Sequence, residues 1–287
     1  MSAGVVRLAR SVADVRRLRA RWRSRNERVA FVPTMGAIHD GHLSLLAAAR
    51  RAADRVVVSV FVNPLQFGPS EDYRRYPRPR ARDHALLRAA GIDALWEPRV
   101  TDLYPAGERT RVRVLGLDAV LEGASRPGHF EGVATIVLKL VNVVQPDVLW
   151  LGQKDAQQAR IIEQMLADLF VPVTVRRGAT ARERDGLARS SRNAYLSRDE
   201  RAEAVALARG LEAARDALGR GERSAASLTR AVRSVWKRYP RVREDYVAVV
   251  DARSLEPVRT VKGRVLVAVA ARVGPARLID NFEWEGR

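Results

Sequence analysis

The stretch Pro33-Thr-Met-Gly-Ala-Ile-His39-Asp-Gly-His42 decides the fold, because it joins an apolar run to an amphipathic segment. Residues 29–33 (Val-Ala-Phe-Val-Pro) are β-branched or apolar and predict a buried strand. Residues 43–53 have helical spacing of apolar side chains and predict a helix, with residues 36–41 as the connecting loop. This loop would follow the carboxyl end of a strand, which is where ligands bind in open α/β sheets.

The same alternation continues on both sides of this stretch. Further strands are predicted at residues 56–62, 92–96, 148–151 and 171–176. Helices are predicted at residues 5–25, 83–90, 133–144 and 156–169, and residues 64–79 are predicted to form a loop. Strands alternating with helices are typical of βαβ units, so residues 1–180 are expected to form a Rossmann-like domain with a parallel sheet.

The pattern changes in the last third of the chain. Two long helices are predicted at residues 198–219 and 224–239, followed by strands near residues 245–250 and 264–273. Residues 181–287 are therefore expected to form a smaller α+β C-terminal domain, and we expect this domain to cover the active site. The fold class is α/β with this second unit.

Composition excludes several kinds of chemistry. The 287 residues include no cysteine and only four histidines, which rules out disulfides, thiolate catalysis and cysteine-based zinc sites. No run approaches the roughly 18 to 20 apolar residues that a membrane-spanning helix needs. The N-terminus also lacks an apolar signal-peptide core, so we expect a cytoplasmic protein that does not bind membranes.

The formal net charge of +18 suggests a nucleic-acid-binding protein as one interpretation. The basic residues are nearly all arginine, however, and they are spread along the chain rather than gathered in one stripe. We therefore interpret the excess as solvated surface that also attracts anionic substrates, and expect no nucleic-acid partner.

Two histidines mark the loop after the first buried strand as a candidate phosphate site. Gly36 and Gly41 permit close approach of the backbone to a ligand. His39 and His42 are three residues apart and should lie on one face of the opening helical turn, beside the N–H groups of the helix start. The alternative is a tight turn with two surface histidines, which we disfavour because half of the chain's histidines occur here.

The motif His39-Asp-Gly-His42 resembles the His-x-Gly-His signature of the nucleotidyltransferase superfamily. Further blocks are similar to the pantothenate synthetase family and occur in that family's order between residues 29 and 197. These blocks are Phe61-Val-Asn63-Pro-Leu-Gln66-Phe-Gly, Tyr76-Pro-Arg78, Glu122-Gly-Ala-Ser-Arg126-Pro-Gly-His129-Phe, Gly152-Gln-Lys154-Asp155-Ala-Gln-Gln158 and Ser190-Ser191-Arg192-Asn193. Any one block would be a weak match, whereas six in order are specific.

The resemblance implies an AMP-forming ligase that condenses pantoate with β-alanine through a pantoyl-adenylate intermediate. It implies ATP as a substrate, Mg²⁺ brought in with the ATP phosphates, and a homodimer. His42, Lys154 and His39 would be the catalytic residues. The ATP-binding residues would be Met35, Gly36, Ala37, Ile38, His39, Asp40, Gly41, His42, Gly152, Gln153, Lys154, Asp155, Ala181, Arg189, Ser190, Ser191 and Arg192.

The substrate side carries neutral amides, which can bind hydroxyl and carboxylate groups without adding charge. The resemblance implies that Gln66, Gln158, Asn63 and Arg126 bind pantoate or β-alanine, with Arg126 and His129 also candidates for ordering the site or the dimer contact.

The sequence departs from the family pattern at two positions. Arg82-Asp83 replaces an acidic pair, which leaves Asp83 as the one expected metal ligand, and Arg189 replaces an apolar residue beside the adenine. Two alternatives remain open: another cytidylyl- or adenylyltransferase of the superfamily, and a basic nucleic-acid-binding protein.

Overall fold

The structure is a computed structural model that describes residues 6–69 and 71–286. The chain divides into two compact units. The N-terminal unit comprises the chain up to Gly152 and then Gln158–Ala179, and the C-terminal unit comprises Gln153–Gln157 and the chain from Thr180 onward. The sequence places one boundary between residues 180 and 181 and does not predict that residues 153–157 belong with the C-terminal unit.

The N-terminal unit is built on a six-stranded parallel sheet, which confirms the predicted fold class. The strands run in the order β1-β4-β3-β2-β5-β6, so the strand order reverses between β2 and β5. A crevice outside the carboxyl ends of the strands at such a reversal is the usual ligand site of this architecture. The bounds are β1 Arg7–Ala9, β2 Val29–Thr34, β3 Arg55–Val60, β4 Ala94–Trp96, β5 Val148–Gly152 and β6 Thr174–Gly178.

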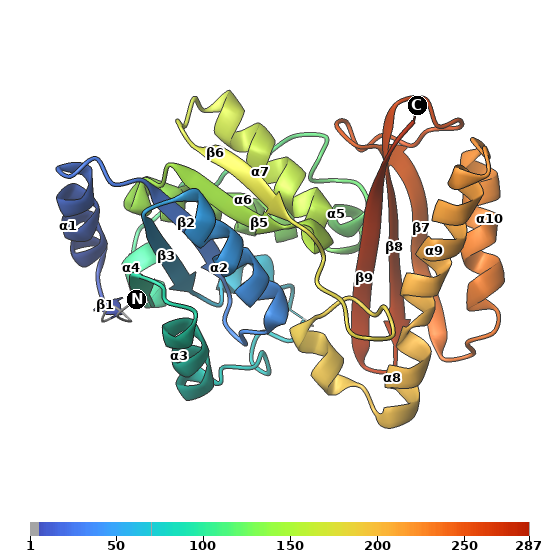
Figure 1. Ribbon diagram of the computed structural model, residues 1–287, viewed down its shortest axis with the longest axis horizontal. Helices are drawn as coiled ribbons and strands as arrows, with labels where there is room; N and C mark the ends of the chain where they lie inside the picture. Colours follow the sequence, from blue (N-terminus) through green and yellow to red (C-terminus); the bar gives the residue numbers. More distant parts are fainter. Residues whose placement is uncertain (1–5, 70, 287) are drawn as a thin grey trace. The chain divides into compact units, whose positions relative to one another are not determined.

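Helices cover both faces of this sheet (Figure 1). Helix α2 (Asp40–Ala52) packs on β2, β3 and β5 and buries Leu45 and Leu46, while α6 (His129–Val144) packs on the other face and is buried along most of its length. The remaining elements of this part of the chain are α1 Val12–Arg23, η1 Pro64–Gln66, α3 Arg80–Ala89, α4 Val100–Leu103, α5 Glu122–Ser125, η2 Gln153–Asp155 and α7 Ala156–Asp168.

The predicted helix over residues 5–25 is wrong at its start. Residues Arg7–Ala9 form the edge strand β1, which pairs in parallel with Ala94–Trp96 of β4. The helix α1 begins only after Ser11, whose hydroxyl accepts the N–H of Asp14 in a capping box. A three-residue strand gains its stability from its partner strand, so the local pattern does not reveal it. Val5 lies outside the described residues.

The C-terminal unit contains a three-stranded antiparallel sheet in the order β7-β8-β9, with α9 and α10 packed against it (Figure 1). Its core includes Leu211, Leu228 and Trp236, and the indole N–H of Trp236 donates to the carbonyl of Ala206 at 2.9 Å. The bounds are η3 Ser191–Tyr195, α8 Arg198–Ala204, α9 Ala206–Gly219, α10 Ala225–Trp236, β7 Val242–Asp251, β8 Arg264–Val273 and β9 Ala276–Glu285.

Two predictions for this unit need correction. The single helix predicted at residues 198–219 is divided into α8 and α9 at Val205. The sequence pattern does not predict the strand β9, because Asp280 and Asn281 interrupt its apolar run with polar side chains that are nonetheless buried. Burial of these two residues depends on partners elsewhere in the chain, which a local pattern does not show.

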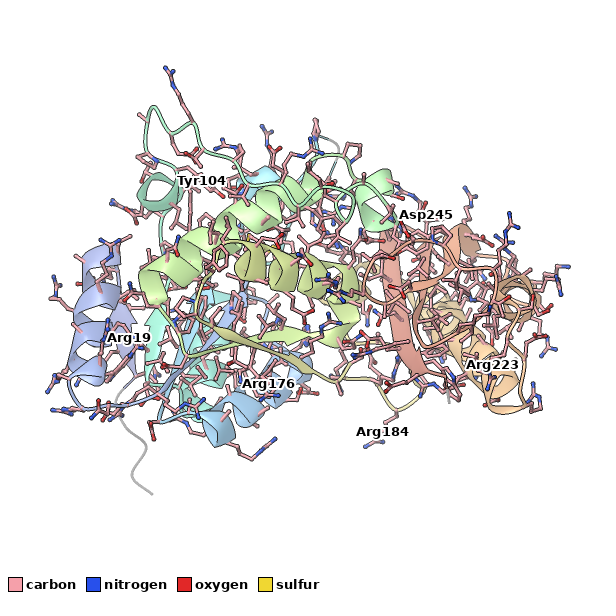
Figure 2. All side chains as sticks on the ribbon, turned by 90° about the horizontal axis from the view of Figure 1, so that it is seen from above. Arg19, Tyr104, Arg176, Arg184, Arg223 and Asp245 are labelled. Atoms are coloured by element: carbon pink, nitrogen blue, oxygen red, sulfur yellow. The ribbon has the colours of Figure 1, made fainter. Side chains whose placement is uncertain are left out.

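The positive charge is distributed over elements of both units. Figure 2 labels Arg19 on α1, Arg176 on β6 and Arg223 just before α10. Many arginines pair with carboxylates; Arg55, for example, lies 2.8 Å from Glu27 and 2.9 Å from Asp93. This dispersal favours the interpretation of the charge as surface. Among the described residues, no helix has the length and apolar character needed to cross a membrane.

Candidate active site

The turn between β2 and α2 is built by its own backbone and by Thr34. The Thr34 hydroxyl donates to the carbonyl of Ser59 at 2.8 Å and accepts the N–H of Gly36 at 3.2 Å. Gly36 has a φ of +84° and Ala37 a φ of +50°, so the chain passes through the left-handed region twice in succession. This conformation is costly for a residue with a side chain and persists only where the surroundings fix it.

Asp83, from α3, supplies that support. Its carboxylate is buried, with 2% of the residue exposed, and its two oxygens accept the N–H groups of Ala37 and Ile38, each at 2.8 Å. A Cβ at Gly36 would lie 3.0 Å from Asp83 Oδ2 and 3.1 Å from Val60 Cγ1, so close packing adds to the preference of the positive φ for glycine at this position. Asp83 thus holds the turn directly before His39.

The predicted role of Asp83 as a magnesium ligand stays a prediction. Both carboxylate oxygens accept backbone N–H groups, so the carboxylate supports the turn. Within residues 6–69 and 71–286, no three histidine or acidic side chains are grouped so as to hold a metal ion. Magnesium usually binds proteins through a few carboxylates plus substrate phosphates, so the described residues provide no protein-made cage for it.

His39 and His42 lie side by side at the start of α2, as predicted, with ring centroids 4.1 Å apart. His39 is the N-cap residue, and its Nδ1 accepts the N–H of Gly41 at 3.1 Å. His42 Nδ1 accepts the N–H of His39 at 3.3 Å. Because Nδ1 is the acceptor in both rings, each neutral imidazole carries its proton on Nε2. Both rings therefore carry an N–H group at Nε2, which is able to donate to a phosphate oxygen.

Asn63 is almost fully buried and uses both ends of its amide within the protein. Its Nδ2 donates to the carbonyl of Gly132 at 3.0 Å, and its Oδ1 accepts the hydroxyl of Tyr104 (labelled in Figure 2) at 2.8 Å. The close approach of α6 needs a glycine, since a Cβ at Gly132 would lie 2.4 Å from the carbonyl oxygen of Leu65. These contacts show Asn63 anchoring η1, and its predicted contact with substrate stays a prediction.

The cluster around Gln66 consists of Arg126, His129 and Glu71. The carbonyl of Gln66 accepts from His129 Nδ1 at 2.7 Å and from Arg126 Nη2 at 3.3 Å. Arg126 also forms a two-pronged ion pair with Glu71, at 2.7 and 2.6 Å. Arg126 thus binds the backbone of Gln66, and its predicted roles in substrate binding, in ordering the site or in a dimer contact stay predictions.

His129 is neutral in this cluster. Burial, and then the charge of Arg126, lower the pKa of His129 to about 4. Arg126 Nη1 lies 3.0 Å from His129 Nε2, which therefore accepts, while Nδ1–H donates to Gln66. Burial alone would raise the pKa of Glu71, but the hydrogen bonds and charge of Arg126 outweigh it and lower that pKa. Arg126 and Glu71 therefore form an ion pair, and the neutral His129 ring links Arg126 to the Gln66 carbonyl.

Gln66 points its amide toward the histidine turn. Its Nε2 lies 3.2 Å from the sulfur of Met35, and the residue is 8% exposed. The N-terminal unit therefore joins two groups of predicted residues: the turn with Met35, and the Gln66 cluster. Gln158 also belongs to this unit and is half-buried on α7.

Gly152 ends β5 in the N-terminal unit, and the C-terminal unit holds the remaining predicted ATP-binding residues. Lys154 lies in the 3₁₀ turn η2, with its Nζ 3.6 Å from Asp155 Oδ1 and its side chain 22% exposed. Arg189 N–H donates to the carbonyl of Ala181 at 2.9 Å, so these two residues are backbone partners. Ser190 caps η3 by accepting the N–H of Arg192 at 3.3 Å.

Asn193 fastens this last segment. Its Nδ2 donates to Glu183 Oε1 and to the carbonyl of Ala188, both at 3.1 Å. Glu183 in turn pairs with Arg201 of α8 at 2.8 Å, and the side-chain hydrogen bond from Arg201 is the largest cause that lowers the pKa of Glu183. The segment that carries Ser190, Ser191 and Arg192 is therefore held by a network of side chains as well as by the short helix η3.

Comparisons with known proteins cover nearly the whole chain. A family model described as Pantoate-beta-alanine ligase matches residues 7–283. The pantothenate synthetase of Moorella thermoacetica is 50% identical over 278 residues, which is 97% of this chain and 98% of that protein. The crystal structure of pantothenate synthetase from Thermus thermophilus has a TM-score of 0.91 at 48% identity and covers 96% of this chain and 99% of that chain. Pantoate-β-alanine ligase from Francisella tularensis, complexed with beta-gamma ATP and β-alanine, has a TM-score of 0.77 at 33% identity and covers 97% of each chain.

The parallel sheet and the histidine-bearing helix start at its reversal point define an α/β protein of the Rossmann-like class with a candidate phosphate site. The family match extends beyond this unit and through the C-terminal sheet. The chain belongs to the pantoate–β-alanine ligase family.

Proposed function

We propose that the protein condenses pantoate with β-alanine to form pantothenate, using ATP and releasing AMP and pyrophosphate. The observation that carries the proposal is the β2–α2 turn, where two Nε2–H imidazoles stand at a helix start in a chain that matches the ligase family over residues 7–283. The complex of the Francisella tularensis relative with beta-gamma ATP and β-alanine supports ATP and β-alanine as substrates.

In the first half-reaction, a carboxylate oxygen of pantoate attacks the α-phosphorus of ATP. A new oxygen–phosphorus bond forms, the bond to the β-phosphate oxygen breaks, and pyrophosphate leaves. Catalysis of this kind relies on positioning, for which proximity contributes roughly 7 to 11 kcal/mol, and on stabilisation of charge at the phosphates. Residues 35–42 would bind the phosphates, with His42 as the proton-bearing donor beside His39.

Lys154 would stabilise the negative charge that develops on the α-phosphate, because an ammonium group is a compact point charge. Ser190, Ser191 and Arg192 would bind the leaving pyrophosphate through hydroxyls and a guanidinium fork. The ribose would be held by Gly152 and Asp155 and the adenine by Ala181 and Arg189, with Gln153 also part of this site. The hydrogen bond between Arg189 and Ala181 supports a common role for the last pair.

In the second half-reaction, the amine of β-alanine attacks the acyl carbon of pantoyl adenylate. The amide bond forms, the bond to the AMP phosphate oxygen breaks, and the amine loses a proton. Gln66 and Gln158 would orient pantoate through their amides. Asn63 and Arg126 would also bind pantoate or β-alanine. The fixed ion pair behind Gln66 supports this assignment, because it holds the Gln66 backbone in one place.

Three further parts of the proposal rest on the family resemblance. Mg²⁺ would enter bound to the ATP phosphates rather than to a cage of protein ligands, which the described residues do not form. A homodimer would have twice the mass of the 31.9 kDa chain, which light scattering after gel filtration measures directly. A cytoplasmic location stays a prediction.

The test measures each half-reaction separately. With ATP, magnesium and pantoate alone, labelled pyrophosphate should exchange into ATP, and sustained AMP release should require added β-alanine. A nucleotidyltransferase that releases a nucleotide-linked product would show no β-alanine-dependent release of AMP. If a well-folded sample shows neither exchange nor AMP release, the proposed function is wrong.

A further inference from the structure

Strand β9 places polar side chains on both of its faces. Side chains alternate along a strand, so Leu278 and Phe282 point into the core of the C-terminal unit, while Asn281 points to the opposite face. Asn281 is nevertheless only 6% exposed. A buried amide on this face must bond to other groups of the protein to offset its loss of water.

The partners of Asn281 are the two residues that begin the η2 turn. Its Nδ2 donates to the carbonyl of Lys154 at 2.7 Å and to the carbonyl of Gln153 at 3.1 Å. Its Oδ1 accepts from Gln153 Nε2 at 3.3 Å, and Gln153 Nε2 also lies 3.2 Å from Glu283 Oε1. One amide therefore binds two of the three carbonyls of the turn and one of its side chains.

The η2 turn gains from such an anchor, because it has only three residues and lies at the N-terminal end of α7. A three-residue 3₁₀ turn has poor hydrogen-bond geometry, and it gains little from its own backbone. The lysine side chain is a flexible four-carbon stem, so the place of its backbone sets the region that its ammonium group reaches. A shift of about 1 Å in a reacting group can cost on the order of 100-fold in rate.

We propose that Asn281 is a positioning residue for Lys154: it fixes the backbone of the η2 turn so that the ammonium group meets the α-phosphate. The proposal rests on the function proposed above. It also gives a reason why residues 153–157 belong with the C-terminal unit, since β9 is their anchor. The competing interpretation is that Asn281 only contributes to the stability of the C-terminal sheet.

The first experiment compares Asn281→Ala and Asn281→Asp with Leu278→Ala, a control on the same strand that is equally buried and contacts the core instead of the turn. Both Asn281 variants should lower the rate constant of pantoate-dependent pyrophosphate exchange by on the order of 10- to 100-fold, with little change in the KM for pantoate. The aspartate should be at least as harmful, because it removes both donors and faces two carbonyl oxygens. Leu278→Ala should lower the Tm while keeping the exchange rate well below that temperature.

The second experiment is a double-mutant cycle with Lys154→Ala. If Asn281 acts through Lys154, adding Asn281→Ala to the Lys154→Ala background should cause no further loss of exchange, whereas Leu278→Ala should have the same small effect in both backgrounds. Losses that multiply, or an Asn281→Asp enzyme as fast as the wild type, would overturn the proposal. Hydrogen exchange at the amides of residues 154–157 should rise in the Asn281 variants and remain unchanged in Leu278→Ala. A folded wild-type protein without any exchange activity would instead refute the proposed function.

Discussion

The two turns expected to bind the ATP phosphates, residues 35–42 and residues 153–155, are held by opposite chemistry. The first is fixed by the Asp83 carboxylate, which accepts two backbone N–H groups at 2.8 Å. The second is fixed by the Asn281 amide, which donates to two backbone carbonyls at 2.7 and 3.1 Å. In each case one buried side chain binds two successive peptide units, and the side chain proposed to bind the phosphates is on one of these residues or on the next residue.

This difference predicts how strongly each turn depends on its anchor. A carbonyl has two lone pairs and finds a second partner more readily than an N–H group, so orphaned buried N–H groups are the rarer and costlier defect. The first turn also contains Gly36 and Ala37 at positive φ, whereas no such strain is found at residues 153–155. Removal of Asp83 should therefore harm its turn more than removal of Asn281 harms the other.

The largest effect is expected for Lys154→Ala, which removes the proposed phosphate-binding group of the second turn instead of its anchor. Loss of one charge-stabilising donor costs on the order of 10²- to 10³-fold in rate, so pyrophosphate exchange should fall by about that factor. The far-ultraviolet circular dichroism and the Tm should stay close to those of the wild type, because the ion pair of the lysine side chain with Asp155 is long, at 3.6 Å. Near-normal exchange would remove Lys154 from the proposed mechanism.

The next effect is expected at Asp83. Asp83→Ala leaves the N–H groups of Ala37 and Ile38 without their acceptor, at a cost of about 1 to 3 kcal/mol for each unsatisfied group. We expect a loss of on the order of 10- to 100-fold in kcat/KM for ATP as the turn relaxes. Asp83→Asn keeps one acceptor oxygen and should lie between Asp83→Ala and the wild type.

A magnesium titration decides between the two roles considered for Asp83. If the carboxylate only holds the turn, the magnesium concentration that gives half-maximal activity should be the same in the wild type and in Asp83→Asn. A large rise in that concentration, with an unchanged KM for ATP, would restore Asp83 as a metal ligand and weaken the comparison between the two turns.

The pH dependence of stability tests the cluster behind Gln66. Burial lowers the pKa of His129 to about 4, below its value of 6.5 in the unfolded chain, so the unfolded state binds the extra proton between these values. The resulting stability is complete above pH 6.5 and is lost as the pH falls toward 4, by about 2 kcal/mol between pH 7 and pH 5. Urea unfolding at the two pH values should show this loss in the wild type and a smaller loss in His129→Gln. An equal loss in both would mean that His129 is not its source.

The elements that could be predicted from the sequence are those whose stability is visible locally. The strand β2 and the helix α2 follow from an apolar run, a glycine-bearing loop and helical spacing, and the structure places them within a few residues of the prediction. The strands β1 and β9 depend on their partners: β1 has three residues paired with β4, and β9 carries Asp280 and Asn281. Asp280 is buried because Arg182 bonds both of its oxygens, at 2.7 and 3.0 Å, which no local pattern predicts.

The candidate site divides in the same way. The residues proposed to react or to bind ligands, such as His42 and Lys154, lie in motifs that the sequence displays. Their anchors do not: Asn281 belongs to no motif, and Asp83 suggests a metal ligand by its residue type and place in the family pattern. An anchor is defined by the backbone groups that it reaches, so its role becomes visible only once the fold brings those groups together.

The smallest effect is expected for Gln158→Ala, at a residue proposed to bind pantoate. This variant tests whether a change outside the two turns leaves ATP binding unaffected. Gln158 lies on α7 in the N-terminal unit, only three residues beyond η2, yet it is proposed to bind pantoate and not ATP. Loss of one hydrogen bond to a charged group costs about 1.5 kcal/mol, so the KM for pantoate should rise roughly 10-fold while the KM for ATP stays unchanged. If both constants rise together, the substitution has disturbed the η2 turn, and the turn then depends on α7 as well as on Asn281. A rise in the KM for pantoate alone would show that Asn281 on β9 holds the η2 turn in place even when a side chain of α7 is changed.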